Sequence, residues 1–194
     1  MLIKPGPLFS PHLTLEPLTE AHAAELKAAC AADPEVWPRL YRESWAPAEF
    51  AASWDKLMVA NTTGRALSYA VIVKDLVVGM TSFLALDAAE ASLDIGATYY
   101  HPDYRGGAVN PAAKYLLLDH AFTGGARRVA FTVDALNTRS QAAVLKLGAT
   151  REGLLRQDRV TWTGRIRDTV IFSILQSEWP EVQDRLNLRL SAFS

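Results

Sequence analysis

The stretch Tyr104-Arg105-Gly106-Gly107-Ala108-Val109-Asn110-Pro111 does most to decide the fold of this chain. It joins an apolar, strand-like run ending at Tyr100 to an apolar helical pattern that continues to about Phe122. Asn110 is favoured as a helix cap and Pro111 as a first helical residue, so we expect the helix to open there. The amides of a helix N-terminus attract anions, and two glycines would let an anion approach the backbone. Taken alone, the pattern fits either an ordinary turn or a phosphate site.

Hydrophobic periodicity around this stretch predicts an α+β (mixed α/β) fold in one domain spanning residues 1–194. The expected sheet is mostly antiparallel, has about seven strands and is flanked by helices. The expected strands cover residues 12–18, 67–73, 76–84, 91–100, 128–133, 151–160 and 165–175, and the expected helices cover 22–30, 47–58, 110–122, 138–147 and 178–188.

Turn residues support these boundaries. Lys74-Asp75 and Thr163-Gly164 are each expected at the tip of a hairpin. Gly148 is expected to end a helix in the left-handed conformation. Gly96, inside a strand, predicts a bulge or a close backbone approach.

Composition limits the function classes. Lys and Arg number 20 and Asp and Glu number 21, for a net charge of −1, which argues against a general nucleic-acid partner. The single cysteine, Cys30, excludes an intrachain disulfide and is expected to be buried rather than catalytic. No run approaches the about 20 apolar residues of a membrane span, so we expect a cytoplasmic protein without membrane contact. The four histidines lack metal-ligand spacing, and we expect no metal.

From Asp94 to Phe122 the chain resembles the cofactor-binding core of the GNAT acetyltransferases. In that family a strand ends in an Arg/Gln-x-x-Gly-x-Gly/Ala loop that wraps the pyrophosphate of coenzyme A. Arg105 matches the first position, whereas Ala108 and Asn110 replace the usual small residues at the fourth and sixth.

Two further motifs place the resemblance in the RimJ/RimL-like branch. Asn137-Thr138-Arg139-Ser140 and Leu147-Gly148-Ala149 are similar to its Asn-x-x-Ser and Leu-Gly-Phe signatures, and the segment 164–179 also looks like that branch. The resemblance implies acetyl-CoA as cofactor and a sheet splayed in its middle. It also implies that the cofactor contacts Ile95, Ala97, Tyr99, Arg105, Gly106, Gly107, Ala108, Val109, Asn110, Asn137 and Ser140.

The residues that would handle protons are less well marked. Ser140 matches a serine placed near the coenzyme A sulfur, where its hydroxyl could protonate the departing thiolate, although a helix-surface role is slightly favoured. Asn137 could cap the following helix, contact the cofactor, or do both. The position of a proposed glutamate base falls near Arg159, so Asp158 and Asp168 are the nearest carboxylates. Asp158 is our candidate base, although a salt bridge to a neighbouring arginine is the simpler interpretation of either aspartate.

The resemblance predicts an N-acetyltransferase that moves acetyl to a primary amine in a ternary complex. A protein N-terminus is the first acceptor it suggests and a small-molecule amine the second. A catalytically silent acyl-CoA sensor or scaffold and a plain interaction domain remain alternatives. Trp37, Tyr41, Trp45 and Trp54 are expected mostly in the core, with some lining an amine site or a homodimer contact. Five arginines on the last hairpin, at 151, 156, 159, 165 and 167, are expected mainly on a solvated face.

Overall fold

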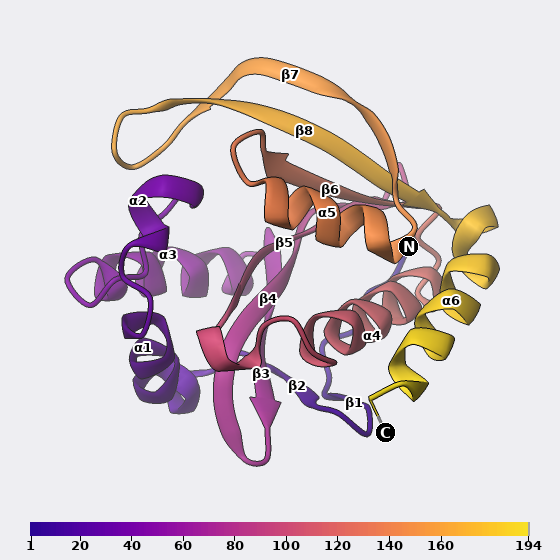
Figure 1. Cartoon of the computed structure of the whole chain (residues 1–194), viewed down its shortest axis with the longest axis horizontal. Coiled ribbons are helices and arrows are strands. Elements are labelled where there is room, and N and C mark those ends of the chain that lie inside the picture. Colours follow the sequence, from indigo (N-terminus) through magenta and orange to yellow (C-terminus); the bar gives the residue numbers. More distant parts are fainter. Residues whose placement is uncertain (194) are drawn as a thin grey trace.

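The computed structural model describes residues 1–193, which form one mixed sheet covered by helices (Figure 1). The sheet has eight strands in the order β1-β2-β3-β4-β5-β6-β8-β7, and every neighbouring pair is antiparallel except β5–β6. The additional strand relative to the expected seven is β1, which has only two residues. The strands are β1 (Leu8–Phe9), β2 (Thr14–Pro17), β3 (Ala66–Val73), β4 (Leu76–Asp87), β5 (Ser92–Tyr100), β6 (Arg128–Asp134), β7 (Thr150–Val160) and β8 (Ile166–Leu175).

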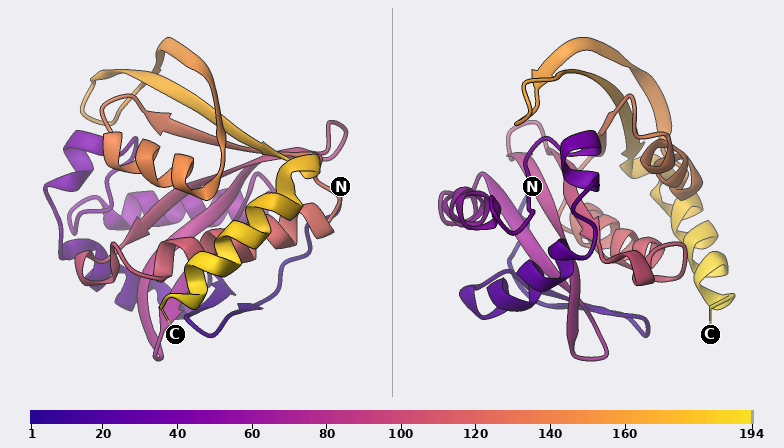
Figure 2. Two further views of the ribbon diagram at one scale, coloured as in Figure 1. Left: turned by 45° about the vertical axis from the view of Figure 1, so that its right-hand side comes forward. Right: turned by 60° about the vertical axis from the view of Figure 1, so that its left-hand side comes forward.

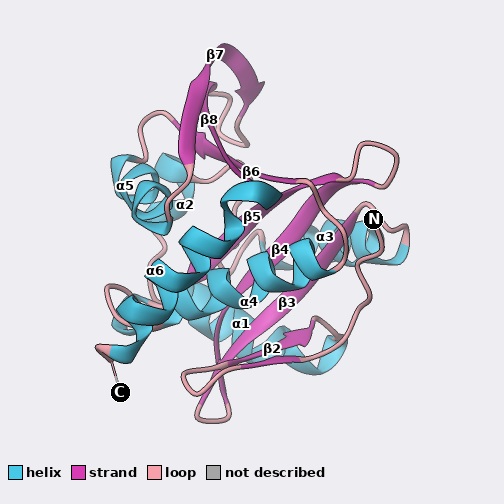
Figure 3. Cartoon of the chain, turned by 90° about the vertical axis from the view of Figure 1, so that its right-hand side faces the viewer, coloured by secondary structure: helices cyan, strands magenta, loops and turns pink. Residues whose placement is uncertain are grey.

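Helices cover both faces of the sheet (Figures 1 and 3). The α-helices are α1 (Ala23–Ala31), α2 (Val36–Leu40), α3 (Phe50–Thr62), α4 (Val109–Thr123), α5 (Thr138–Leu147) and α6 (Trp179–Ser191). The larger core lies between the sheet and α4, α5 and α6, and a smaller aromatic-rich core lies under α1, α2 and α3. Trp37, Trp45 and Trp54 are buried in the smaller core, as is Cys30, which confirms the interpretation of these residues as core.

The sheet splits between its two central strands. β5 and β6 pair only where Ser92–Asp94 face Arg128–Ala130. Beyond that point β5 continues to Tyr100 on β4 alone, while β6 continues on β8 alone. This confirms the expected splay, and among residues 1–193 the inner edges of β5 past Asp94 and of β6 past Ala130 lack a sheet partner. Unpaired strand edges can accept an extended ligand as an added strand.

The β7–β8 hairpin bends over this split toward α2 (Figure 2). At its tip Trp162 donates its backbone N–H to Arg42 O at 3.1 Å and its indole Nε1–H to Trp37 O at 3.2 Å. The turn lies where the sequence predicts it, with Gly164 at φ +83°. The other two turn predictions are also confirmed: Lys74 and Asp75 have φ of 49° and 64°, and Gly148 ends α5 at φ +101°.

Two local predictions were wrong by a residue or two. Helix α4 begins at Val109 with Ala108 at the cap position, so Asn110 is a helical residue and makes no capping bond. Pro111 is therefore the third residue of the helix. Proline is tolerated there because the amides of the first helical turn have no intrahelical acceptor. The bulge of β5 lies at Ala97, with φ +46°, and not at Gly96.

Candidate active site

The glycine turn leaves its amides free. The loop after β5 forms a short 3₁₀ turn at Pro102–Tyr104 and then reverses at Gly106, which has φ +82°. No acceptor within residues 1–193 takes the backbone N–H of Gly106, Gly107 or Ala108. A methyl group added at Gly106 or Gly107 would meet no atom within 4 Å. The loop therefore offers unpaired donors, next to the N-terminus of α4, with room for a ligand to approach.

The side chain of Arg105 ties this loop to the end of β5 and to Asp33. Its Nε–H donates to Tyr100 O at 2.8 Å, and its Nη1 donates to Asp33 Oδ2 at 2.6 Å. Its guanidinium also lies 5.3 Å from the centre of the Tyr99 ring. Because Asp33 neutralises much of this charge, the guanidinium acts mainly as a structural anchor, and the anion-binding capacity of the loop lies in its amides.

A cavity of about 380 Å³ connects the loop with the segment that follows β6. Arg105 and Asn137 both line it, so two cofactor candidates far apart in the sequence meet at one site. Arg39 and Arg139 also line it, and neither has a carboxylate partner in the described part of the chain. The remaining lining residues are Asp33, Glu35, Val36, Leu40, Leu136 and Thr138.

Asn137 and Ser140 form the start of α5. Asn137 Oδ1 accepts the backbone N–H of Ser140 at 3.0 Å, which confirms that Asn137 caps this helix. The capping bond occupies the oxygen and leaves the Nδ2 hydrogens of Asn137 for a ligand in the cavity. Ser140 is half-buried, and its hydroxyl has no partner among residues 1–193.

The predicted cofactor strand has its side chains turned into the core. Ile95 and Tyr99 are buried at 3% and 1% exposure, so only their backbone is available to a ligand. Ala97, at the bulge, is half-buried. The next carbonyl, Thr98 O, already accepts the hydroxyl of Tyr41 at 2.9 Å. Tyr41 itself is only half-buried and lies between the smaller core and this strand.

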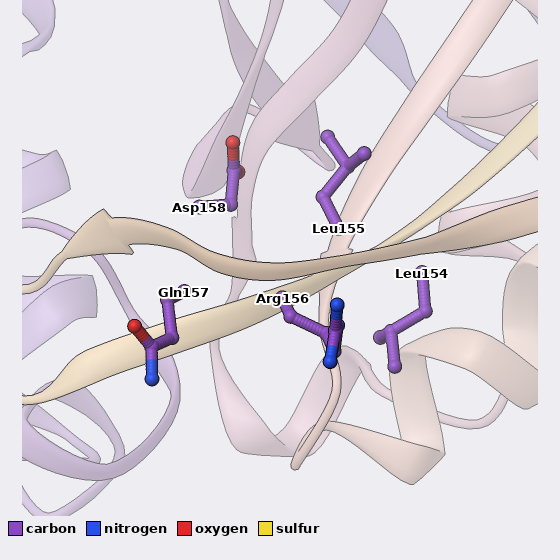
Figure 4. Close-up of a pocket in the computed structure, with 5 residues that line it drawn as sticks. All are labelled: Leu154, Leu155, Arg156, Gln157 and Asp158. Carbon is purple, nitrogen blue, oxygen red and sulfur yellow. The ribbon is translucent and has the colours of Figure 1, made fainter.

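Asp158 lies at a different hollow. It lines a depression of about 680 Å³ along β7 together with Leu154, Leu155, Arg156 and Gln157. Figure 4 shows Asp158 and Leu155 on one side of the strand and Leu154 and Arg156 on the other. Asp158 Oδ2 accepts Arg159 Nε–H at 2.9 Å, so the expected salt bridge is present. Burial raises the pKa of Asp158, but the nearby Thr169 hydroxyl and Arg159 outweigh it, and the pKa ends below its ordinary value.

The arginines of the last hairpin are less solvated than expected. Arg167 is buried at 7% exposure, and both it and Arg165 face the buried carboxylate of Asp134. Arg165 Nη2 donates to Asp134 Oδ2 at 2.5 Å, whereas Arg151 and Arg156 are exposed as expected. The solvated-face interpretation was therefore wrong for Arg165 and Arg167, because Asp134 on β6 supplies a buried partner that the hairpin sequence does not reveal.

Two ionisable residues escaped the sequence analysis. Asp94 is half-buried at the point where β5 leaves β6, and burial raises its pKa against the opposing charges of Arg159 and Arg128. Lys114 is buried on α4 at 5% exposure. A lysine inside the apolar run Pro111–Leu118 was a visible signal, since a cation on the inner face of a helix is rare.

Comparison with known proteins identifies the family. The model of the acetyltransferase (GNAT) domain matches residues 12–150. The chain therefore belongs to the GNAT acetyltransferases, and it is an enzyme that uses acetyl-CoA as its acetyl donor. A search of the curated proteins finds no match to this sequence.

Solved structures share the fold over nearly the whole chain. A protein of T. thermophilus assigned to the acetyltransferases is 36% identical, with a TM-score of 0.88 and coverage of 98% of this chain and 100% of that one. A GCN5-related N-acetyltransferase from Brucella melitensis is 30% identical, with a TM-score of 0.88 and coverage of 98% and 90%. RimJ of Mycobacterium smegmatis, solved with CoA-disulfide, is 26% identical, with a TM-score of 0.79 and coverage of 94% and 92%. The expected similarity to the RimJ/RimL-like branch is thereby confirmed.

The site fits a coenzyme A molecule on its own features. Free amides, a helix N-terminus and two unpaired arginines suit the phosphates, and the open edge of β5 suits an extended amide-bearing arm. Among residues 1–193, no group of three or more His, Cys, Asp or Glu could hold a metal ion. In that same range no helix is both long and apolar enough to cross a membrane.

Proposed function

We propose that this enzyme transfers acetyl directly from acetyl-CoA to a primary amine while both are bound, with a protein N-terminus as the first acceptor and a small-molecule amine as the second. The observation that carries the proposal is that Arg105, which directly precedes the free amides of the glycine turn, and Asn137, which caps α5, line one cavity. The unpaired edge of β5 runs to Tyr100, just before this loop. The N-terminal acceptor is supported by the sequence motifs that resemble the RimJ/RimL-like branch. A solved RimL of the same fold, 19% identical, is described as a ribosomal L7/L12 alpha-N-protein acetyltransferase.

Both backbone amides and side chains would bind acetyl-CoA. The amides of Gly106, Gly107 and Ala108 would hold the diphosphate against the N-terminus of α4, where the helix dipole favours negative charge. Asn137 Nδ2 would donate to the bound molecule while its oxygen keeps α5 capped. Arg139 would contribute an uncompensated positive charge, since its guanidinium has no carboxylate partner in the described chain.

Proton transfer needs a donor and an acceptor on this chain. Acetyl-CoA supplies the activated acetyl group, and we assign to the hydroxyl of Ser140, which has no partner among residues 1–193, the role of giving a proton to the departing sulfur. A carboxylate would take the proton of the amine. Asp158 is the sequence candidate, but the Thr169 hydroxyl and Arg159 lower its pKa, whereas burial raises the pKa of Asp94, at the point where β5 leaves β6. Both aspartates are therefore tested as the base.

Calorimetric titration with acetyl-CoA, desulfo-CoA and ATP tests the site directly. We expect saturable binding of both coenzyme A forms and weak or no binding of ATP. Arg139→Ala should weaken this binding, while Arg151→Ala, an exposed arginine on β7, serves as the matched control. Equal affinity in the two variants would remove Arg139 from the site, and no binding at all would refute the assignment.

Turnover then separates an enzyme from a silent binder. Acetyl transfer would be measured with peptides bearing free N-termini, with the same peptides blocked, and with small amines. Asp94→Asn and Asp158→Asn, compared at equal saturation, identify the base, and we expect the larger loss of kcat in Asp94→Asn. Binding without transfer to any amine would favour the acyl-CoA sensor instead.

A further inference from the structure

Helix α4 carries one charged side chain into the centre of the protein. Lys114 is buried at 5% exposure among apolar neighbours on its own helix, and no carboxylate pairs with it in the described chain. Its Nζ donates to Thr98 Oγ1 at 2.7 Å and to Thr81 Oγ1 at 3.0 Å. Two hydroxyls are the only hydrogen-bond partners of this amine within residues 1–193.

The fold does not require this lysine. Burial without a counter-charge disfavours the ammonium form and lowers the pKa of Lys114 to about 7. Thr81 and Thr98 lie 2.8 Å apart and already share a hydrogen bond, so neither hydroxyl would be left unsatisfied without the amine. An apolar side chain of the same length would fill the space at lower cost. The stability of the fold therefore does not account for a lysine at this position.

That effect falls on the bulge of β5. Thr98 directly follows Ala97, the residue at φ +46°, where the register between β4 and β5 shifts. Lys114 holds the hydroxyl of Thr98, and Tyr41 holds its carbonyl at 2.9 Å from the other side. This segment of β5 lies past the split from β6, along the edge where the acetyl-bearing arm is expected to lie.

We propose that Lys114 is a positioning residue for acetyl transfer: through the hydroxyl of Thr98 it fixes the β5 bulge so that its backbone N–H groups face the thioester carbonyl. The inference rests on the proposed function, because it needs acetyl-CoA along β5. An N–H donor that is already fixed toward the thioester carbonyl polarises it, and the protein need not reorganise during the reaction. A mobile bulge would still bind acetyl-CoA but would polarise its carbonyl less. Loss of Lys114 should therefore impair polarisation and turnover rather than affinity.

Infrared spectroscopy of bound [1-¹³C]acetyl-CoA tests this without knowledge of the acceptor. In the wild-type protein we expect the thioester carbonyl band to lie below its position for free acetyl-CoA. Lys114→Met and Thr98→Val should each return the band toward the free position while acetyl-CoA still binds with near wild-type affinity. The double variant should do no more than either single one, since both act on the same contact. Lys146→Met, an exposed lysine on α5, is the matched control and should keep the shift.

Thermal unfolding and kinetics complete the test. Lys114→Met should unfold at a higher temperature than wild type, and kcat should fall by about ten- to a hundredfold with little change in KM for acetyl-CoA. An unchanged carbonyl band, or a variant that loses stability and affinity together, would overturn the proposal. A wild-type protein that binds acetyl-CoA without any band shift would also overturn it. Failure of the wild-type protein to bind acetyl-CoA would instead refute the proposed function.

Discussion

Replacing Lys114 by methionine should stabilise the protein by an amount that depends on pH. In the unfolded chain this amine has its ordinary pKa of 10.5, and in the folded chain burial lowers the pKa to about 7. Between these values the unfolded state binds more protons than the folded state, so the contribution of Lys114 to the free energy of unfolding rises with pH. Below pH 7 the penalty is complete, and it fades as pH rises from about 7 to 10.5.

The size of the effect follows from the two pKa values. Their difference corresponds to roughly 5 kcal/mol at pH 7, with a slope of about 1.4 kcal/mol per pH unit in the window above it. This is an upper bound, because a buried lysine relaxes toward polar neighbours, and here Thr81 and Thr98 are within hydrogen-bonding reach. The described groups that bond to the amine from β4 and β5 are hydroxyls, and burial alone accounts for the lowered pKa.

Urea unfolding at several pH values from about 7 to 10 measures this effect. Other groups titrate in the same range, but they cancel when Lys114→Met is compared with wild type at each pH. The variant should be more stable at pH 7, and its advantage should shrink steadily as pH rises. Lys146→Met should show no such trend, since Lys146 is exposed. A stability difference that is independent of pH, or a variant less stable than wild type at pH 7, would refute the reasoning.

Three further predictions concern the loop and the buried ion pairs. Asn110→Asp adds a negative charge to the first turn of α4, so it should raise stability by about 0.3 to 1 kcal/mol yet weaken acetyl-CoA binding, as measured by thermal unfolding and calorimetry. Gly106→Ala forces a side chain into φ +82° and should lower the free energy of unfolding by about 1 to 2 kcal/mol in urea titrations. Asp134→Ala leaves Arg165 and Arg167 without their carboxylate and should cost about 3 to 5 kcal/mol by the same measurement.

Each of these has a clear contrary result. Unchanged affinity in Asn110→Asp would mean that the phosphates do not lie at this helix terminus. A neutral Gly106→Ala would show that the turn can leave the left-handed conformation at no cost. If Asp134→Ala unfolds like wild type, the two arginines must reach solvent once the carboxylate is removed.

The features that were predictable from sequence are those set by neighbouring residues. Gly148 and Gly164 adopt positive φ because a chain reversal needs it, and each follows a segment whose periodicity is plain. Lys74 and Asp75 close a hairpin for the same local reason. The loop after β5 could be located because two glycines separate a strand pattern from a helix pattern. Its role was suggested only by its combination with the later motifs.

What sequence could not supply was the contact between distant segments. Arg105 was expected to contact the cofactor, and the sequence could not show that one of its nitrogens also donates to Asp33, 72 residues away. Asn110 was placed at a cap from local preference, whereas α4 begins two residues earlier, with Ala108 at the cap position. The bulge lies at Ala97 rather than Gly96, next to Thr98, whose side chain is bonded to β4 and α4.

Three unfavourable features lie close together where chemistry is expected. Among residues 1–193, the inner edge of β5 has no strand partner past Asp94, the amides of the glycine turn have no acceptor, and Lys114 is buried with no counter-charge. Each is unfavourable for the protein alone. All three lie along β5, in the loop after it, or against its side chains. A bound acetyl-CoA would satisfy the first two, and the third would hold the strand that presents them. On this reasoning the cofactor completes the fold as well as taking part in the reaction, and the free protein should be least stable along this edge.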